Sequence, residues 1–417
     1  MSMSSTNISH HHPTATHHRN DDGPAWLSAA AGLCASLVGL GLARFAYTPL
    51  IPALIAAKWF SPAEAVYLGA ANLAGYLVGA LIARELGTRA GSVRALRWAM
   101  VLASICCFAC SMPVSFVWFS AWRFLAGVTG GVIMVLAAST ILPHVAPGKR
   151  GIVGGVIFAG VGLGVAASGT LVPLLLQQGL RQTWYGLGIL SAILTLVSWK
   201  AWPAEAPATE RKPDSHIPSH GRGLTIVRVL SAEYGLNALA LVPHMVFLVD
   251  FVARGLGQGI SAGSHYWVLY GIGATVGPLL TGHLADRAGF GPALRVAFLV
   301  EAIAILLPAL SSAPAAMIVS SIIVGGFTPG IVPLVLGRIH ELLPHSSSSQ
   351  RAAWAQATTT FALFQAAGAY GLSYLFERTG GDYTVLFVIG AGAVAASLAI
   401  DLGTALTIGR ERKPSGV

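Results

Sequence analysis

The chain has 417 residues, of which 54% are hydrophobic and only 10% are charged. Soluble domains carry about 25% charged residues, so this composition excludes a soluble enzyme and a disordered chain and indicates a protein solvated by lipid. The formal net charge is +9. A net positive charge is typical of proteins that bind nucleic acid or an anionic surface. In a membrane protein it can be interpreted only after each cation has been assigned to one side of the membrane.

Apolar windows along the chain predict twelve membrane-spanning helices, because a span needs about 20 mostly apolar residues. Helices are required, since a segment in lipid must satisfy its own backbone polar groups and these runs are too long for barrel strands. The first six spans are predicted at 26–47, 65–83, 98–114, 119–142, 152–175 and 185–199, and the second six at 226–251, 266–281, 296–310, 315–336, 353–375 and 384–400.

A polar insert at 203–223 divides the spans into two sets of six. We therefore predict an all-α membrane protein with an N-terminal six-helix bundle over 26–202 and a C-terminal six-helix bundle over 224–406. The insert is a predicted cytoplasmic linker, and residues 407–417 form a short cytoplasmic tail. Residues 1–25 are polar and rich in histidine, without the apolar stretch of a signal peptide. A disordered cytoplasmic tail is favoured there over a metal site.

The positions of the cations indicate how the chain crosses the membrane. If the spans alternate from a cytoplasmic N-terminus, four of the 25 Lys and Arg residues lie outside, two (Arg44 and Arg123) lie within spans, and nineteen face the cytoplasm. The positive-inside rule expects this asymmetry. Both termini are therefore predicted to be cytoplasmic, in the cell (inner) membrane. The basic charge then orients the chain, and no nucleic-acid partner is expected.

Two similar segments follow the second and the eighth predicted spans. The first reads GALIARELG from Gly79, and the second reads GHLADRAG from Gly282. A glycine, a leucine and an arginine recur between them at a constant offset of 203, which is close to half of the chain. The halves therefore look like a duplication, and parallel repeats of this kind place a solute site near the midplane between them.

The segment from Gly282, which includes Asp286 and Arg287, matches the loop motif that the major facilitator superfamily carries after its second and eighth helices. The stretch RFLAGVTG from Arg123 resembles the motif on the fourth helix of that superfamily. The stretches GLGLARFAYTPL from Gly39 and YLGAANLAGY from Tyr67 resemble its uncharacterised YbfB/YjiJ-like branch. The superfamily resemblance covers all twelve spans.

This resemblance implies a transporter that works by alternating access, with helices 1, 2, 4, 5, 7, 8, 10 and 11 around a central cavity. Two departures from the superfamily pattern bear on function. In the first half, Ala83 occupies the position of the motif aspartate, which is Asp286 in the second half. A cytoplasmic latch that depends on this aspartate is therefore not expected in the first half. The glycine-rich fifth span lacks the Gly-Pro centre of many drug antiporters, which disfavours the commonest form of drug efflux.

Two arginines within spans are the leading candidates for solute contact. A charge at mid-membrane costs about 2.5–3.5 kcal/mol on insertion scales, so it persists where it faces a cavity or a partner. Arg44 and Arg123 together suit a carboxylate or another planar anion, because a guanidinium binds such a group through two parallel hydrogen bonds. A structural ion pair for Arg44 and outward snorkelling for Arg123 are the alternatives. The other predicted cavity residues are Tyr47, Asn72, Tyr76, Asn237, His244 and Gln365, each of which can instead serve helix packing.

Acidic residues on helix 7 and in the loop motif are candidates for coupling and gating. Glu233 is the predicted proton carrier, since burial favours the neutral form of a carboxyl group; solvation or pairing with Arg228 is the alternative. Asp250 is expected to pair with Arg44 in an outer gate that is closed when the transporter faces inward. Asp286 and Arg287 are predicted to latch the halves in the outward-facing state through the N-terminus of helix 11. Glu301 lies on helix 9, which the resemblance makes peripheral, so no role is predicted for it.

The sequence thus predicts a secondary active transporter of a small organic solute, proton-coupled, with preference for an anionic substrate. The alternatives are an efflux exporter of amphipathic compounds and a membrane receptor or scaffold that has lost transport. The predicted partners are the solute, protons and the lipid bilayer, and a monomer is expected. The four cysteines lie in apolar runs without companion ligands, so no metal or cofactor is expected. An intramembrane enzyme would need paired acids, or a nucleophile with a base, at one depth. The sequence shows no such pair, so an enzyme is not expected.

Overall fold

The computed structural model describes residues 22–146, 149–204, 222–344 and 347–411. Every regular element within these ranges is a helix. Most of the predicted His-rich tail, most of the predicted linker and the end of the C-terminal tail lie outside them. The last residues of the predicted tail and of the predicted linker are helical, because α1 begins at Asp22 and α8 begins at Arg222, both earlier than the predicted spans.

The N-terminal bundle starts with an interrupted helix 1. It consists of α1 (Asp22–Ser36), the π-helical η1 (Leu37–Leu42), the 3-10 helix η2 (Phe45–Leu50) and α2 (Ile51–Ala56). The bundle continues with α3 (Pro62–Ala90), α4 (Ser92–Ala109), α5 (Phe116–Ile141) with the short η3 (Leu142–His144), α6 (Arg150–Leu176) and α7 (Leu180–Ser198).

The C-terminal bundle starts with an interrupted helix 7, which repeats the break seen in helix 1. It consists of α8 (Arg222–Ala240), the π-helical η5 (Pro243–Phe247), α9 (Leu248–Asp250) and the π-helical η6 (Phe251–Gly255). The bundle continues with α10 (Gly259–Ala288), α11 (Phe290–Leu310), α12 (Pro314–Leu342), α13 (Ser347–Arg378) and α14 (Tyr383–Glu411).

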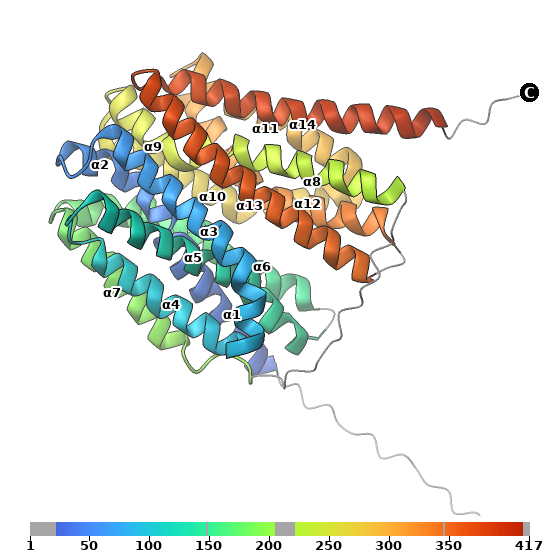
Figure 1. Ribbon diagram of the computed structural model, residues 1–417, viewed down its shortest axis with the longest axis horizontal. Helices are drawn as coiled ribbons and strands as arrows, with labels where there is room; N and C mark the ends of the chain where they lie inside the picture. The colour runs from blue at the N-terminus through green and yellow to red at the C-terminus, as the bar shows by residue number, and fades with distance from the viewer. Residues whose placement is uncertain (1–21, 147–148, 205–221, 345–346, 412–417) are drawn as a thin grey trace, which may run out of the picture.

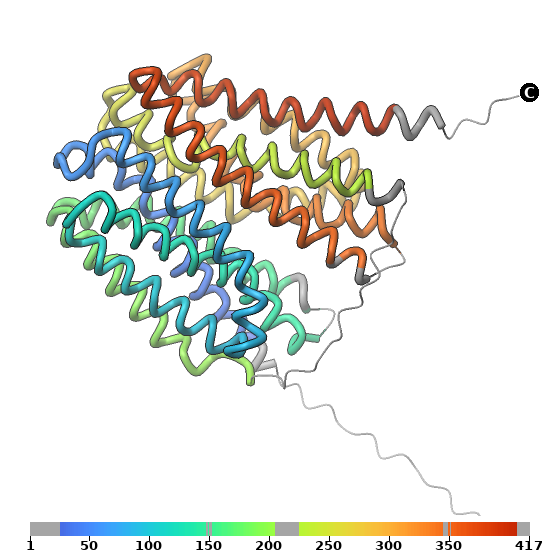
Figure 2. Tube along the Cα trace, viewed as in Figure 1, coloured from blue at the N-terminus to red at the C-terminus, as the bar shows by residue number. Residues whose placement is uncertain are grey.

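Within the described residues, ten helices are long and apolar enough to cross a membrane. The more polar α7 and α13 are the two further long helices, and with them the predicted twelve spans are all helical. Figure 1 shows the two bundles stacked on each other. Figure 2 traces the N-terminal parts of α1 and α8 and the C-terminal parts of α7 and α14 toward one side of the molecule, which we call the terminal face. The other side is the opposite face.

Glycines let helices within each bundle pack backbone to backbone, as expected for helices in lipid. On α5, a Cβ at Gly127 would overlap the backbone carbonyl of Asn72 on α3. On α12, a Cβ at Gly325 would overlap the backbone carbonyl of Tyr270 on α10. The same helix pair in each half is therefore held in closest contact, which is the structural form of the duplication.

The contact between the bundles along α6 and α10 weakens toward the terminal face. A Cβ at Gly169 would lie 2.7 Å from Val268, and one at Gly162 would lie 2.7 Å from the backbone nitrogen of Thr275. One step further toward the terminal face, at Gly155 and Gly282, no atom of the described residues lies within 4 Å of such a Cβ. The two helices thus touch at mid-depth and toward the opposite face and diverge toward the terminal face.

Candidate functional site

A small cavity between the bundles brings together four of the predicted solute-contact residues. Arg44, Tyr47, Asn72 and Arg123 all line it from the N-terminal bundle, and Met245 and Val246 of helix 7 complete it. Its volume of about 20 Å³ has room for a water molecule, but not for an organic solute. In this conformation the cavity is therefore too small to hold a solute between its polar groups.

Arg44 sits between η1 and η2, where helix 1 changes its winding. Its Nη2 donates a 2.8 Å hydrogen bond to Oε1 of Gln365 on α13, so two predicted site residues meet across the bundle interface. The guanidinium also lies over the rings of Tyr76 and Phe45, at 4.8 and 5.0 Å from their centroids. Its Nε is buried without a partner among the described residues.

Arg123 is only 2% exposed on α5. Its Nη1 donates a 2.7 Å hydrogen bond to the backbone carbonyl of Ala43, beside Arg44. The guanidinium lies 4.1 Å from the ring centroid of Tyr47, which is held in place because its hydroxyl donates to the backbone carbonyl of Ala65 at 2.7 Å. Asn72 donates from Nδ2 to the Arg123 carbonyl at 3.0 Å, which ties α3 to α5 beneath the cavity.

Neither the Arg44 nor the Arg123 guanidinium has a carboxylate partner among the described residues. Among the described residues, carboxylates pair with Arg89, Arg254, Arg295 and Arg338, but not with Arg44 or Arg123. Nε of Arg123, like that of Arg44, is buried without a partner in the same part of the chain. The cavity is thus a positively charged site with free donors, which suits an anion.

Helix 1 and helix 7 close the cavity on the side of the opposite face. Thr48 Oγ1 donates a 2.6 Å hydrogen bond to the backbone carbonyl of Met245, which lies in the π-helical turn η5. The Nε2 of Gln365 donates to the Met245 sulfur at 3.6 Å. Gln365 thereby links Arg44 to helix 7.

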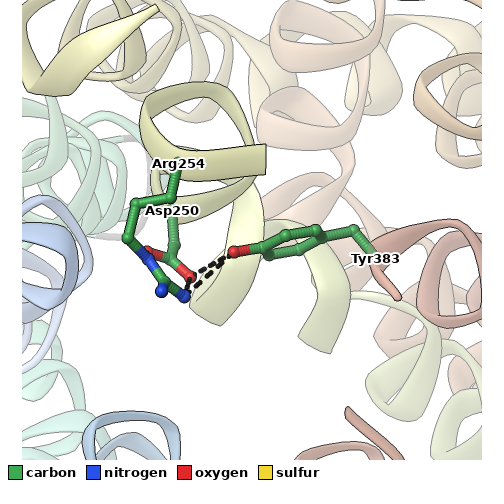
Figure 3. Close-up of polar contacts among 3 residues, drawn as sticks. All are labelled: Asp250, Arg254 and Tyr383. Atoms are coloured by element: carbon green, nitrogen blue, oxygen red, sulfur yellow. Dashed lines mark hydrogen bonds and ion pairs between the residues drawn. The ribbon is translucent and has the colours of Figure 1, made fainter. Parts of the chain in front are cut away.

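Asp250 is completely buried and has two partners within the C-terminal bundle. Nε and Nη2 of Arg254, one turn along helix 7, lie 2.5 and 2.7 Å from its two carboxylate oxygens. The hydroxyl of Tyr383 on α14 donates to Oδ2 at 2.6 Å, as Figure 3 shows. The Tyr383 oxygen also accepts a 3.1 Å hydrogen bond from Arg254.

This arrangement corrects the predicted Arg44–Asp250 ion pair. The bundles are in contact near the opposite face, where that pair is expected, yet Asp250 bonds within its own bundle and Arg44 bonds to Gln365. The physical reason is proximity: Arg254 follows Asp250 by four residues on the same helix, so the pair forms without crossing the interface.

Three other predicted residues of helix 7 face the interior of the C-terminal bundle instead of the cavity. Asn237 Nδ2 donates a 2.6 Å hydrogen bond to Oε2 of Glu301 on α11. His244 Nε2 bonds to Ser320 Oγ at 2.7 Å. Glu233 is 2% exposed and lies within electrostatic reach of Asp401, Arg338 and Arg295. The cavity assignment of Asn237 and His244 is therefore wrong about the direction in which they point.

Glu301 is the residue that the sequence interpretation missed. It is completely buried on α11, with its only described hydrogen bond to Asn237. The available signal was the acid itself, because a carboxyl group within a span implies a partner or a cavity. The expectation that helix 9 is peripheral concealed it.

Asp286 and Arg287 lie at the end of α10 on the terminal face, and both are exposed. Neither has a hydrogen-bond or ion-pair partner among the described residues. The bundles diverge on this side, so the latch predicted for the outward-facing state is not formed in this conformation.

Twelve helices in two repeated bundles around a central polar cavity define a transporter of the major facilitator superfamily. Among solved structures, a mutant of the nucleoside transporter NupG matches with a TM-score of 0.71 and 14% identity, over 90% of this chain and 99% of that one. The xylose transporter XylE from E. coli, in a partially occluded inward open conformation, matches with a TM-score of 0.70 and 14% identity, over 91% and 98%. These likenesses establish the fold.

The family is established by sequence. The family described as "Uncharacterised MFS-type transporter YbfB" matches residues 36–402, and the chain belongs to it. A comparison with curated protein sequences gives no significant match. The protein is therefore a multi-pass membrane transporter of this family, as the motifs from Gly39, Tyr67, Arg123 and Gly282 indicate.

Proposed function

We propose that this protein is a secondary active transporter that moves a small organic anion by alternating access, coupled to protons. The observation that carries the proposal is the central cavity, where Arg44 and Arg123 present guanidiniums that no described carboxylate neutralises. Burying two unpaired cations is costly, and a bound carboxylate removes that cost while it accepts their free N–H groups.

The conformation supports alternating access between the two bundles. Contacts through Thr48 and Met245 close the side of the opposite face, whereas α6 and α10 separate at Gly155 and Gly282. With the terminal face placed in the cytoplasm by the positive-inside rule, this is an inward-facing arrangement in the cell membrane. We propose that Glu233, on that side of helix 7, takes part in proton coupling and that the transporter works as a monomer.

Anion binding can be tested before the natural solute is known. Purified protein is heated with benzoate or with benzamide, its neutral analogue of similar shape, and the unfolding midpoint is measured. A ligand that binds only the folded state stabilises it by about 2.7 kcal/mol at a concentration 100 times its dissociation constant. We expect stabilisation by benzoate alone, and its loss in Arg44→Gln and Arg123→Gln.

The matched control is Arg181→Gln, which removes an exposed arginine on the opposite face and is expected to keep the full response to benzoate. Equal stabilisation by benzamide would refute the proposed preference for an anion. An unchanged benzoate response in both Arg44→Gln and Arg123→Gln would refute it as well. Uptake of radiolabelled benzoate into proteoliposomes, with and without a pH gradient, then tests transport and its coupling to protons.

A further inference from the structure

The interior of the C-terminal bundle contains a carboxyl group that the solute cavity does not use. Glu301 has 0% exposure at mid-length of α11. Asn237 donates to its Oε2 at 2.6 Å. The other carboxyl oxygen, Oε1, and the amide oxygen of Asn237, Oδ1, are both buried without a partner among the described residues. Two acceptors thus lie unused on the two side chains of one hydrogen-bonded pair.

No described cation forms an ion pair with Glu301. Arg295, on the same helix, pairs instead with Asp401, and Arg338 pairs with Glu341. The helices packed against α11 are α10, α12 and α14, and α8 contacts it through Asn237. The described titratable and charged side chains on these helices and on η5 are Arg228, Glu233 and Tyr234 on α8, His244 on η5, His265, Tyr266, Tyr270, His283 and the exposed Asp286 and Arg287 on α10, Arg338, His340 and Glu341 on α12, and Tyr383 and Asp401 on α14. A charged carboxylate would therefore be buried with one amide N–H as its only described donor, which is highly unfavourable.

A proton on Glu301 resolves both unused acceptors at once. A carboxylic acid and a primary amide can form a cyclic pair, in which the amide N–H donates to the carbonyl and the acid O–H donates to the amide oxygen. Asn237 already makes the first of these bonds. A proton on Oε1 supplies the donor that Asn237 Oδ1 lacks and fills the remaining capacity of the carboxyl group.

We propose that Glu301 and Asn237 form a proton-binding site within the C-terminal bundle, separated from the solute cavity by helix 7. The proposal rests on the proposed proton-coupled transport, for which it names the loaded group. In the loading step a hydronium ion transfers its proton to Oε1, an O–H bond forms, water is released and the carboxylate becomes neutral. Unloading reverses these changes.

The neighbouring polar groups are arranged along the same side of helix 7. Glu233 precedes Asn237 by four residues, or about 6 Å along the helix, in the direction of the terminal face. It lies within electrostatic reach of the Arg295–Asp401 pair. Further along helix 7, beyond Asn237 in the direction of the opposite face, His244 bonds to Ser320. Along helix 7, Glu233 thus lies between the terminal face and the residue that bonds to Glu301.

Infrared spectroscopy of the full-length protein in detergent tests the site without any solute. A protonated carboxylic acid has a carbonyl stretch above the amide bands, which shifts in D₂O. We expect this band near neutral pH in the wild type, its loss in Glu301→Gln and a frequency shift in Asn237→Leu, which removes one hydrogen-bond partner. Glu301→Gln is expected to fold, because its amide can donate to Asn237 Oδ1 as the acid does.

The matched control is Glu85→Gln, which changes an exposed acid on α3 and is expected to leave the band unchanged. Absence of the band near neutral pH in the wild type, or its persistence in Glu301→Gln, would overturn the proposal. Loss in Glu233→Gln with retention in Glu301→Gln would place the proton on Glu233 and overturn it equally. If Glu301→Gln does not fold, an unshifted band in Asn237→Leu overturns it. Because no solute is present, the outcome is independent of the benzoate experiments.

Discussion

The separation of α6 and α10 leads to a prediction about the conformation that this structure does not show. The two antiparallel helices touch at Gly169 with Val268 and at Gly162 with Thr275. Each pair is displaced from the other by seven residues on both helices, which is about two helical turns. The same step toward the terminal face pairs Gly155 with Gly282, the first residue of the loop motif. We predict that these two glycines meet when the bundles close on the terminal face.

Replacement of Gly155 by leucine should block that closure while leaving the present conformation intact. Within the part of the chain that the structure describes, no atom lies within 4 Å of a Cβ at position 155. A helix gains about 0.8–1.0 kcal/mol when glycine is replaced by a residue of good helix propensity. In the closed state the side chain would meet backbone, as a Cβ at Gly162 would meet Thr275. Overpacking of this kind costs about 1–3 kcal/mol, which lowers the closed population about 5- to 150-fold.

The assay is a distance measurement between spin labels at Thr88 and Ala288, near the terminal-face ends of α3 and α10. In the wild type we expect a shorter, closed distance to contribute, and in Gly155→Leu we expect it to be lost. The control is Gly392→Leu, at an exposed position on α14 where no described atom lies within 4 Å of a Cβ. Independently, a Gly155→Cys/Gly282→Cys double variant should form a disulfide, which requires Cα atoms within about 7 Å. An unchanged distance distribution in Gly155→Leu, or no disulfide, would refute the predicted register.

Three further predictions concern polar contacts at the two faces. Tyr383→Phe removes a hydrogen bond to the buried carboxylate of Asp250, so the free energy of unfolding, measured by denaturant titration, should fall by about 1.5–3 kcal/mol; no change would show that this bond does not stabilise the bundle. Tyr67→Phe removes a 3.2 Å bond to the exposed Glu377 across the bundles. Because exposed contacts contribute at most about 1 kcal/mol, opening of the opposite face, measured by cysteine labelling, should rise no more than about fivefold, and a larger rise would contradict this. Asp286→Asn should leave the unfolding temperature unchanged and lower the yield of the disulfide described above, because the predicted latch places a carboxylate at a helix N-terminus; an unchanged yield would rule the latch out.

The sequence was sufficient for the fold because lipid imposes simple rules on it. Apolar length predicts the spans, and the repeat at an offset of 203 predicts their arrangement. It also placed Arg44 and Arg123 in one cavity, since an arginine in a span must face a partner or a polar space. Both belong to the pocket that the structure shows.

The partners of the helix 7 residues could not be predicted in the same way. Helix 7 is largely buried all round, so hydrophobic periodicity does not indicate which side faces the cavity. The π turns at η5 and η6 then change the register of the residues beyond Pro243. For Asp250 our interpretation considered only Arg44 as a partner, whereas Arg254, four residues further along the same helix, forms the ion pair. For Glu301 we predicted no role because its helix was expected to be peripheral. The cost of a carboxyl group within a span should have carried more weight, because it implies a partner or a cavity.

Helix 7 separates the two proposed sites, and this arrangement predicts how they communicate. Met245 and Val246 face the anion cavity, whereas Asn237 bonds to Glu301 on the other side of the helix. If movement of helix 7 couples the sites, the factor by which a proton changes anion affinity equals the factor by which the anion changes proton affinity. Stabilisation by benzenesulfonate, which keeps its charge from mildly acidic to mildly alkaline pH, should then depend on pH in the wild type. It should be independent of pH in Glu301→Gln, which cannot exchange the proton, and should keep the wild-type dependence in Glu85→Gln. The same pH dependence in Glu301→Gln as in the wild type would show that the anion site responds to a different proton.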